Sequence, residues 1–598
     1  MADWDLDREG AEPAWRLRPT ILAVVGTVAA VAIQQLLDRG SGRSYNLAPL
    51  ENWRIALSIA VGTGAMAFGF GMERMRLLWA AVFALLTGAV AGLIYYWNGG
   101  HSGWDDFGDW RYASLFLSIA IAVPLFQTAR DEGAWRFPYR DVHGHAWTNV
   151  VLWFACWVFV GVVFLLAWLL AALFDLIGLH VVREMLERHW FSAALAGAAF
   201  GGALGLFRER DRVVRLLQRV VTAVLAVLAP VLGVGLLLFL VALPFTGLGA
   251  LWEATKSTTP ILLSCVIGAL ILANAVIGNG EEEEVANPLL RWGAMALGLA
   301  MLPLCVIAAI ATGLRIDQHG FTPDRLWALI FVILATVYGV AYLVSLVLGR
   351  TGWAALARPA NLRIAFIVAA LALFLATPIL SFNAISTADQ IARLESGRIA
   401  ADKFDWAALA FDFGDPGKAA LKRLAGSKNG AIAALARAAS GKEGRWQVDR
   451  ITSEAREVDA LTKRLRVLPA AIPVPEALRN ELTSWDGCGD NDKDPCILLY
   501  TQGAAEAFAL RASCLEEMTT QEPSADKLNM TVSAQCDEAR YRLVGSEWKL
   551  LGDDKTPPLD PAQREALKAG LAAGNVEVRT VPSRRLYVGG VPVGAPFE

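Results

Sequence analysis

The residues best suited to chemistry lie in FPYRDVHGHAWTNVVLW, residues 137–153. His143 and His145 are one residue apart, with Asp141 before them and Asn149 after. Imidazole binds metals and titrates near neutral pH. On a helix, Asp141 and His145 would share a face, as would His145 and Asn149. A metal would need a further ligand, and no other histidine is close in sequence. The group is therefore a candidate for metal binding or pH sensing.

The same stretch is also typical of a membrane edge, and this is the interpretation that we favour. Aromatic side chains gather at both water interfaces of membrane proteins, where their rings sit at headgroup depth. Five of them surround the two histidines: Trp135, Phe137, Tyr139, Trp147 and Trp153.

A second candidate is LPFTGLGALWEATKSTTPILLSCVIGALILANAVIG, residues 243–278. Asn274 lies in its apolar run, where an amide is costly unless it bonds to a neighbouring helix, so we expect an interhelical hydrogen bond. As an alternative, Asn274 and the polar loop before it would line an external pocket for a ligand or lipid. The loop residues of that pocket are Trp252, Glu253, Thr255, Lys256, Thr258 and Thr259.

No motif of a common reaction class is present: the sequence lacks GxxxxGK[ST], HExxH, GxSxG, GxGxxG and CxxC. All six histidines precede residue 320, so the C-terminal part cannot build a histidine-dependent catalytic or metal site. We therefore predict no catalytic residue and no cofactor. Asp105, Asp106 and Asp109 could hold a metal in a membrane enzyme, although their short polar segment is more typical of a solvated loop.

The composition requires a membrane domain to position these residues. The chain has 598 residues, of which 55% are hydrophobic and 21 are tryptophan. A helix of about 20 apolar residues spans a bilayer, and eleven segments qualify. They lie near 19–37, 53–71, 76–97, 110–127, 147–176, 190–207, 220–243, 260–278, 290–312, 324–348 and 361–381.

Charge predicts the domain boundary and the orientation. Residues 1–381 carry 26 basic and 26 acidic residues, whereas 382–598 carry 28 and 31, so the boundary falls near Ser381. Neither part has the basic excess of a nucleic-acid binder. Alternate loops of the membrane domain hold 17 and 8 Lys and Arg residues. Because cytoplasmic loops retain the excess, we predict a cytoplasmic segment 1–18, a transmembrane domain 19–381 and an external domain 382–598.

The C-terminal domain is predicted to be a soluble mixed α/β domain, with a helix near 453–466 and a strand over 539–551 among its elements. It contains four cysteines, an even number that in a non-cytoplasmic domain indicates disulfides. We favour the pairs Cys488–Cys496 and Cys514–Cys536 among the three pairings that four cysteines allow. The other three, Cys156, Cys265 and Cys305, lie in predicted spans.

Two further patterns concern packing and lipid. Gly197, Gly201 and Gly205 recur every four residues, which lets a neighbouring helix approach closely, and Gly88 and Gly92 form a weaker version. Arg212, Arg215 and Arg219 share one helical face. This face suits contact with anionic lipid headgroups. A solvated face that serves only to set the topology would have the same pattern.

Several phrases identify a family by resemblance. The chain resembles the bacterial integral-membrane family known as domain of unknown function 4153, in its alphaproteobacterial form, over about residues 20–400. The resemblance rests on PLFQTARDEG, HAWTNVVLWFACW, FRERDR, LPFTGLGALWEATKSTTPILL, LANAVIGNG, FTPDRLWAL and ATPILSFNAISTADQIARLESG. It implies a multi-span fold in the bacterial inner membrane and brings no activity, ligand or catalytic residue.

Two function classes follow. In the first, a non-enzymatic envelope protein anchors, senses or binds a periplasmic protein partner through its external domain. In the second, a transporter or lipid-handling protein uses the region 243–278. A cavity reached from Glu253 and Asn274 would distinguish the second from the first.

Overall fold

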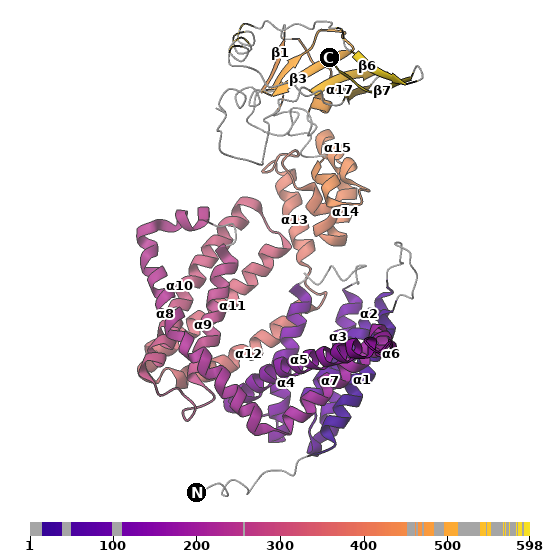
Figure 1. Cartoon of the computed structure of the whole chain (residues 1–598). Helices are drawn as coiled ribbons and strands as arrows, with labels where there is room; N and C mark the ends of the chain where they lie inside the picture. Colours follow the sequence, from indigo (N-terminus) through magenta and orange to yellow (C-terminus); the bar gives the residue numbers. More distant parts are fainter. Residues whose placement is uncertain are drawn as a thin grey trace, which may run out of the picture. The chain divides into compact units, whose positions relative to one another are not determined.

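The computed structural model describes residues 15–38, 50–98, 110–254 and 258–450 (Figure 1). In the tail it describes 464–468, 472–482, 496–511, 539–545, 547–551, 584–588 and 591–597, and the single positions 461, 562, 566, 569, 573 and 582. The chain divides into two compact units, Met1–Ser386 and Thr387–Glu598.

Eleven helices of the described residues are long and apolar enough to cross a membrane, which confirms the predicted number. They are α1 (Arg18–Leu37), α2 (Asn52–Gly71), α3 (Leu77–Trp97), α4 (Trp110–Glu132), α5 (Tyr139–Asp175), α7 (His189–Arg208), α8 (Asp211–Ala254), α9 (Thr258–Ile277), α10 (Pro288–His319), α11 (Pro323–Gly349) and α12 (Ala354–Ala376). Short elements join them: α6 (Val181–Glu187) and the 3₁₀ turns Arg74–Arg76 and Arg350–Gly352.

Glycines determine how closely α1 and α7 pack. A Cβ on Gly201 would lie 2.0 Å from the carbonyl oxygen of Leu22, and one on Gly197 would lie 2.2 Å from that of Gly26. On the next turn, a Cβ on Gly205 would lie 2.5 Å from the Cα of Pro19. The two backbones are therefore in direct contact, which confirms the close approach that the glycine spacing predicts.

The membrane unit contains two groups of helices. Figure 1 shows α8, α9, α10 and α11 together on one side, and α1, α2, α3 and α7 on the other. In the first group α10 is central, since Ala294, Leu297, Met301 and Leu304 are fully buried among α8, α9 and α11. The second group has a separate core that includes Leu22, Phe70 and Leu204. α4, α5 and α12 connect the groups, because α4 packs on α12 and α5 contacts α4, α7 and α8.

The second unit is mixed α/β, as predicted. The helix α13 (Phe382–Glu395) begins in the first unit and continues into the second. With α14 (Gly414–Leu424), α15 (Gly430–Ala439) and a π-helical turn, Ala408–Asp412, it surrounds a core that contains Trp406 and Leu409. A five-stranded sheet follows in the order β1-β2-β3-β4-β5, in which only the β1–β2 pair is parallel. The remaining elements are β1 (Leu465–Leu468), α17 (Glu476–Leu482), β2 (Cys496–Leu499), β3 (Glu506–Arg511), β4 (Ala539–Val544), β5 (Glu547–Leu551) and the hairpin β6 (Arg584–Val588) and β7 (Val591–Phe597).

Two predicted elements of the tail were wrong in detail. The strand expected over 539–551 is a hairpin, because Gly545 adopts a φ of +70° and turns the chain so that Val544 lies opposite Glu547. The helix expected near 453–466 is helical at its described positions Leu461 and Arg464, but it ends before Leu465, where β1 begins and pairs with β2. Cross-strand pairing, which periodicity alone does not report, decides both cases.

Candidate functional site

The histidine stretch forms the first turns of α5, and its two imidazoles have different partners. The Nε2 of His145 lies 3.0 Å from the Oδ2 of Asp131 on α4. The Nδ1 of His143 contacts the amide oxygen of Asn279, and its Nε2 accepts a hydrogen bond from the Trp147 indole at 3.1 Å. Residues two apart on a helix lie about 200° apart, so the histidines do not converge. In the described part of the chain, no three His, Cys, Asp or Glu side chains form a group that could hold a metal.

Of the two polar neighbours of the histidines, Asn149 is bonded to another helix. Asn149 exchanges two hydrogen bonds with Gln127 of α4, at 2.8 and 3.1 Å, and does not pair with His145. Gln127 also donates to the Phe70 carbonyl at 2.8 Å. Asp141 is half-buried in the first turn of α5.

Three side chains from α4 and α7 cap the end of α2. Beside Gln127, Arg130 donates to the Gly71 carbonyl at 2.7 Å and Arg208 donates to the Gly69 carbonyl at 2.8 Å. The last carbonyls of a helix have no partner within it. These bonds therefore supply donors to carbonyl oxygens that would be costly to leave unpaired near the membrane. Arg208 also pairs with Glu73 at 3.3 Å, and Arg18 contacts the same carboxylate. The sequence showed the charged residues but not that they meet here.

Asn274 forms the interhelical bond that the sequence predicts. Its Nδ2 donates to the hydroxyl of Tyr342 on α11 at 2.9 Å and to the Leu270 carbonyl of its own helix at 2.8 Å. Its Oδ1 accepts from Asn361 of α12 at 2.8 Å and, at the longer distance of 3.5 Å, from Tyr139 of α5. One amide thus connects α9 to three other helices.

The described residues of the predicted external pocket do not surround Asn274. Thr258 and Thr259 begin α9 and are buried, and Thr259 shares a hydrogen bond with Thr312 of α10 at 3.1 Å. Asn274 lies fifteen residues further along α9, which corresponds to about 22 Å. Thr255 and Lys256 are outside the described residues, as are the side chains of Trp252 and Glu253.

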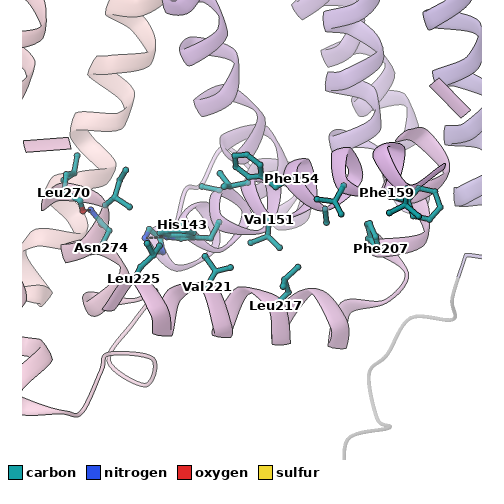
Figure 2. Close-up of a pocket in the computed structure, with 17 residues that line it drawn as sticks. His143, Val151, Phe154, Phe159, Phe207, Leu217, Val221, Leu225, Leu270 and Asn274 are labelled. Atoms are coloured by element: carbon teal, nitrogen blue, oxygen red, sulfur yellow. Dashed lines mark hydrogen bonds between the residues drawn. The ribbon is translucent and has the colours of Figure 1, made fainter. Parts of the chain in front are cut away.

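Asn274 instead lies at one end of a groove between α5, α8 and α9 (Figure 2). The groove has a volume of about 1030 Å³. In Figure 2, His143, Leu225 and Asn274 lie at one end, Phe159 and Phe207 lie at the other, and Leu217 and Val221 of α8 face α5 between them. Its lining residues are His143, Ala146, Trp147, Val150, Val151, Phe154, Ala155, Val158, Phe159, Val162, Phe207, Leu217, Val221, Leu225, Leu270, Ile271 and Asn274.

The wall of the groove is almost wholly hydrocarbon. The three lining residues with polar side-chain atoms, His143, Trp147 and Asn274, gather toward one end and bond to each other or to neighbouring segments of the chain. Phe154 and Val158 are exposed, so the groove is open along α5. The stretch of α5 from His143 to Val162 measures about 28 Å. This elongated apolar shape suits a fatty chain.

The arginine face of α8 points away from the groove. Arg215 and Arg219 are exposed. At 100° per residue they lie on roughly the opposite side of α8 from Leu217 and Val221. The side chain of Arg212 is outside the described residues.

Several predicted residues cannot be placed. Three tail cysteines, Cys488, Cys514 and Cys536, lie outside the described residues, and so do Asp105, Asp106 and Asp109. Cys496 is fully buried on β2 and is not among the free cysteines of the described chain, which are Cys156, Cys265 and Cys305.

Comparison with known proteins agrees with the membrane architecture. Neither curated proteins nor solved structures give a match. A family model, described as a domain of unknown function (DUF4153), matches residues 21–416, which include all eleven candidate spans except the first three residues of α1. The chain therefore belongs to the DUF4153 family of membrane proteins.

Proposed function

We propose that the protein binds a lipid or a lipid-like amphiphile in the groove between α5, α8 and α9, without transforming it chemically. The observation that carries this proposal is the apolar lining of the groove, which ends at His143 and Asn274. Ligand sites commonly combine a large apolar wall with a few convergent polar groups, and volumes of roughly 300–1,000 Å³ are typical. Lipid chains surround spanning helices, so an open apolar groove among such helices is supplied with this ligand.

The groove suits a lipid better than a polar transported solute. The polar atoms that line the groove are already bonded within the protein, so a solute with many hydrogen-bonding groups would lose its water without replacement, at a cost of about 1–3 kcal/mol per group. A fatty chain has no such cost.

We also propose a membrane orientation and a role for the tail. We place the protein in the bacterial inner membrane with its amino terminus in the cytoplasm and residues 382–598 in the periplasm, where the tail binds an envelope protein. The 17 to 8 distribution of Lys and Arg over alternate loops supports this orientation. The four tail cysteines support an oxidising compartment. The exposed Arg215 and Arg219 would then meet the anionic cytoplasmic leaflet.

The test is lipid retention by the full-length protein. Ala155 lines the groove, whereas Ala172 is exposed further along α5 and does not line it. Ala155→Phe should fill the groove and lower the amount of lipid that co-purifies, measured by native mass spectrometry, several-fold relative to Ala172→Phe. Equal retention by the two variants, with both folded, would reject the groove as the binding site.

A further inference from the structure

Close contacts place the ends of several helices on one side of the membrane unit. The end of α7 lies beside the start of α1, where a Cβ on Gly205 would lie 2.5 Å from the Cα of Pro19. Arg208, the last residue of α7, bonds to a carbonyl in the last turn of α2. Arg130, in the last turn of α4, bonds to the carbonyl of Gly71, where α2 ends. We name the side at which α1 begins and α2, α4 and α7 end the amino-terminal side.

The start of α5 and the end of α9 lie on the same side. His145 pairs with Asp131 in the last turn of α4, and His143 contacts Asn279, two residues beyond the end of α9. The short connection 278–287 bonds back to the last turn of α9 and leads into α10. α10 therefore also begins on the amino-terminal side.

The first five turns of α8 stay on this side. Val214, in the first turn, is buried in one core with Phe70 of the last turn of α2. Farther along, Pro230 meets the second turn of α10, where a Cβ on Gly293 would lie 2.5 Å from the Pro230 nitrogen. The helix between these two contacts measures about 24 Å. The segment 211–230, which we name the surface segment, therefore runs along the membrane surface and not across it.

Beyond Pro230, α8 crosses the membrane beside α10. A Cβ on Gly233 would lie 3.1 Å from the Cβ of Ala296, one turn beyond the contact between Pro230 and Gly293, so the two helices run in the same direction. The stretch from Pro230 to Gly247 measures about 26 Å, which suits a hydrocarbon thickness of about 30 Å. In Figure 2 the ribbon of the surface segment runs across the view, whereas that of α9 runs from top to bottom.

The exposed side chains of the surface segment suit the membrane interface. Arg215 and Arg219 form a basic face. Next to it lies an exposed apolar stripe with four-residue spacing, formed by Leu216, Val220 and Val224. This arrangement is typical of a helix in the plane of the interface, with its apolar side among acyl chains and its basic side among headgroups.

The groove follows the surface segment. Phe207, the last residue but one of α7, lines one end. His143 and Asn274, which lies in the last turn of α9, line the other. Leu217 and Leu225 of the surface segment also line it. Both ends of the groove therefore lie on the amino-terminal side, whereas a groove along a spanning helix would have its ends on opposite sides.

We propose that the groove serves one leaflet of the membrane, the leaflet on the amino-terminal side, and holds a lipid of that leaflet with its chain lying along the membrane surface. Headgroups of the same leaflet cover Arg215 and Arg219. The groove then retains lipid within one leaflet and is not a path between the two. This inference rests on the proposed function and adds the source of the lipid and the direction of its chain.

Depth measurements test the geometry. A fluorescent amino acid replaces one residue of the full-length protein at a time by amber suppression. The vesicles contain phosphatidylcholine with a nitroxide either near the top of the acyl chain, the shallow quencher, or in its lower half, the deep quencher. The ratio of shallow to deep quenching should stay above one at Leu216, Val220 and Val224.

α3 provides the matched control, because Leu78, Val82 and Leu86 are exposed at the same four-residue spacing. Along a spanning helix these positions cover about 12 Å of depth, most of the roughly 15 Å of hydrocarbon in one leaflet. The ratio should therefore fall from above one at Leu78 to below one at Leu86. A similar fall along the surface segment, or a ratio below one at all three of its positions, would overturn the inference.

A crosslink tests the source of the lipid. Benzoylphenylalanine at position 154, where Phe154 is exposed and lines the groove, captures lipid in vesicles whose outer leaflet contains deuterated phosphatidylcholine. Vesicles sorted for an accessible amino-terminal tag should give mainly deuterated adduct, and those of opposite orientation mainly undeuterated adduct. The reverse result, or one mixture in both, would overturn the inference.

The proposed lipid site is tested separately. A failure in depth or in leaflet leaves it standing, because lipid retention by Ala155→Phe against Ala172→Phe does not depend on either. Equal retention by those two variants would overturn the proposed function itself, and with it the bound chain.

Discussion

Replacing Gly201 of α7 with alanine should separate α1 from α7 and weaken the membrane unit. The added Cβ would lie 2.0 Å from the Leu22 carbonyl oxygen and 2.6 Å from its carbon, whereas ordinary contact begins at 3.4 Å. Both atoms are backbone, so no side chain can rotate away, and the helices would have to separate by roughly 1.4 Å. Overpacking of this kind costs about 1–3 kcal/mol.

Gly202 provides a matched control on the same helix. A Cβ there would lie 3.7 Å from its nearest neighbour, the Cβ of Ala23, which is an ordinary contact. Both substitutions gain the same helix propensity, up to about 1 kcal/mol, so the difference between the two variants isolates the clash.

The measurement is equilibrium unfolding of the full chain in mixed micelles of increasing dodecyl sulfate fraction, followed by tryptophan fluorescence. Gly202→Ala should match or exceed the wild type. Gly201→Ala should be about 1–3 kcal/mol less stable than Gly202→Ala, which is roughly a 5- to 150-fold change in the unfolding equilibrium. Equal stability of the two variants would refute the backbone contact between α1 and α7.

Three further predictions concern other parts of the chain. Asn274→Leu removes the oxygen that accepts a hydrogen bond from Asn361 and the nitrogen that donates one to Tyr342. The same unfolding assay should therefore show a loss of stability of about 1–3 kcal/mol per buried atom left without a partner. A variant as stable as the wild type would contradict the four-helix connection. In the tail, the two β4 arginines, Arg540 and Arg542, lower the pKa of Glu506 below its usual value. The stability from this pairing is complete above the unfolded pKa of about 4.3 and is lost as the pH falls through the lower folded pKa. The protection factors of the β3 amides, corrected for the intrinsic pH dependence of exchange, should therefore fall there, and Glu506→Gln should remove that step. Alkylation of the denatured protein without reduction, read by peptide mass, should modify the three span cysteines fully and the tail cysteines only after reduction; four freely alkylated tail thiols would argue against a periplasmic tail. The tail set is Cys488, Cys496, Cys514 and Cys536.

Local properties of the sequence predicted the fold well where an element forms its backbone hydrogen bonds within itself. A spanning helix bonds its own backbone, so apolar length alone located all eleven spans. The spacing of Gly197, Gly201 and Gly205 predicted a close helix contact for the same reason, because it depends on one helix face. That the partner is α1 was not predictable, since more than 150 residues separate the two helices.

The candidate site depended on contacts that no local pattern reports. An amide within an apolar run predicted an interhelical bond from Asn274, yet its partners Tyr342 and Asn361 lie about 70 and 90 residues further along the chain. The groove escaped prediction altogether, because apolar lining residues on α5, α8 and α9 look like ordinary lipid-facing residues when each helix is read alone. The sequence singled out His143, but its contact with Asn279 is visible only in the folded chain.

The contact between α1 and α7 has a consequence for biosynthesis. At 5–20 residues per second, a ribosome needs about 10–30 s to translate the chain that separates the end of α1 from the end of α7. During that interval the small-residue face of α1 has only lipid, insertion machinery or the spans α2 to α5 beside it, while α2 and α3 can already pair. In the nascent protein α1 therefore lacks its main partner until α7 has been translated. Slow translation of the chain between them would prolong the time in which α1 can pack against another membrane protein instead.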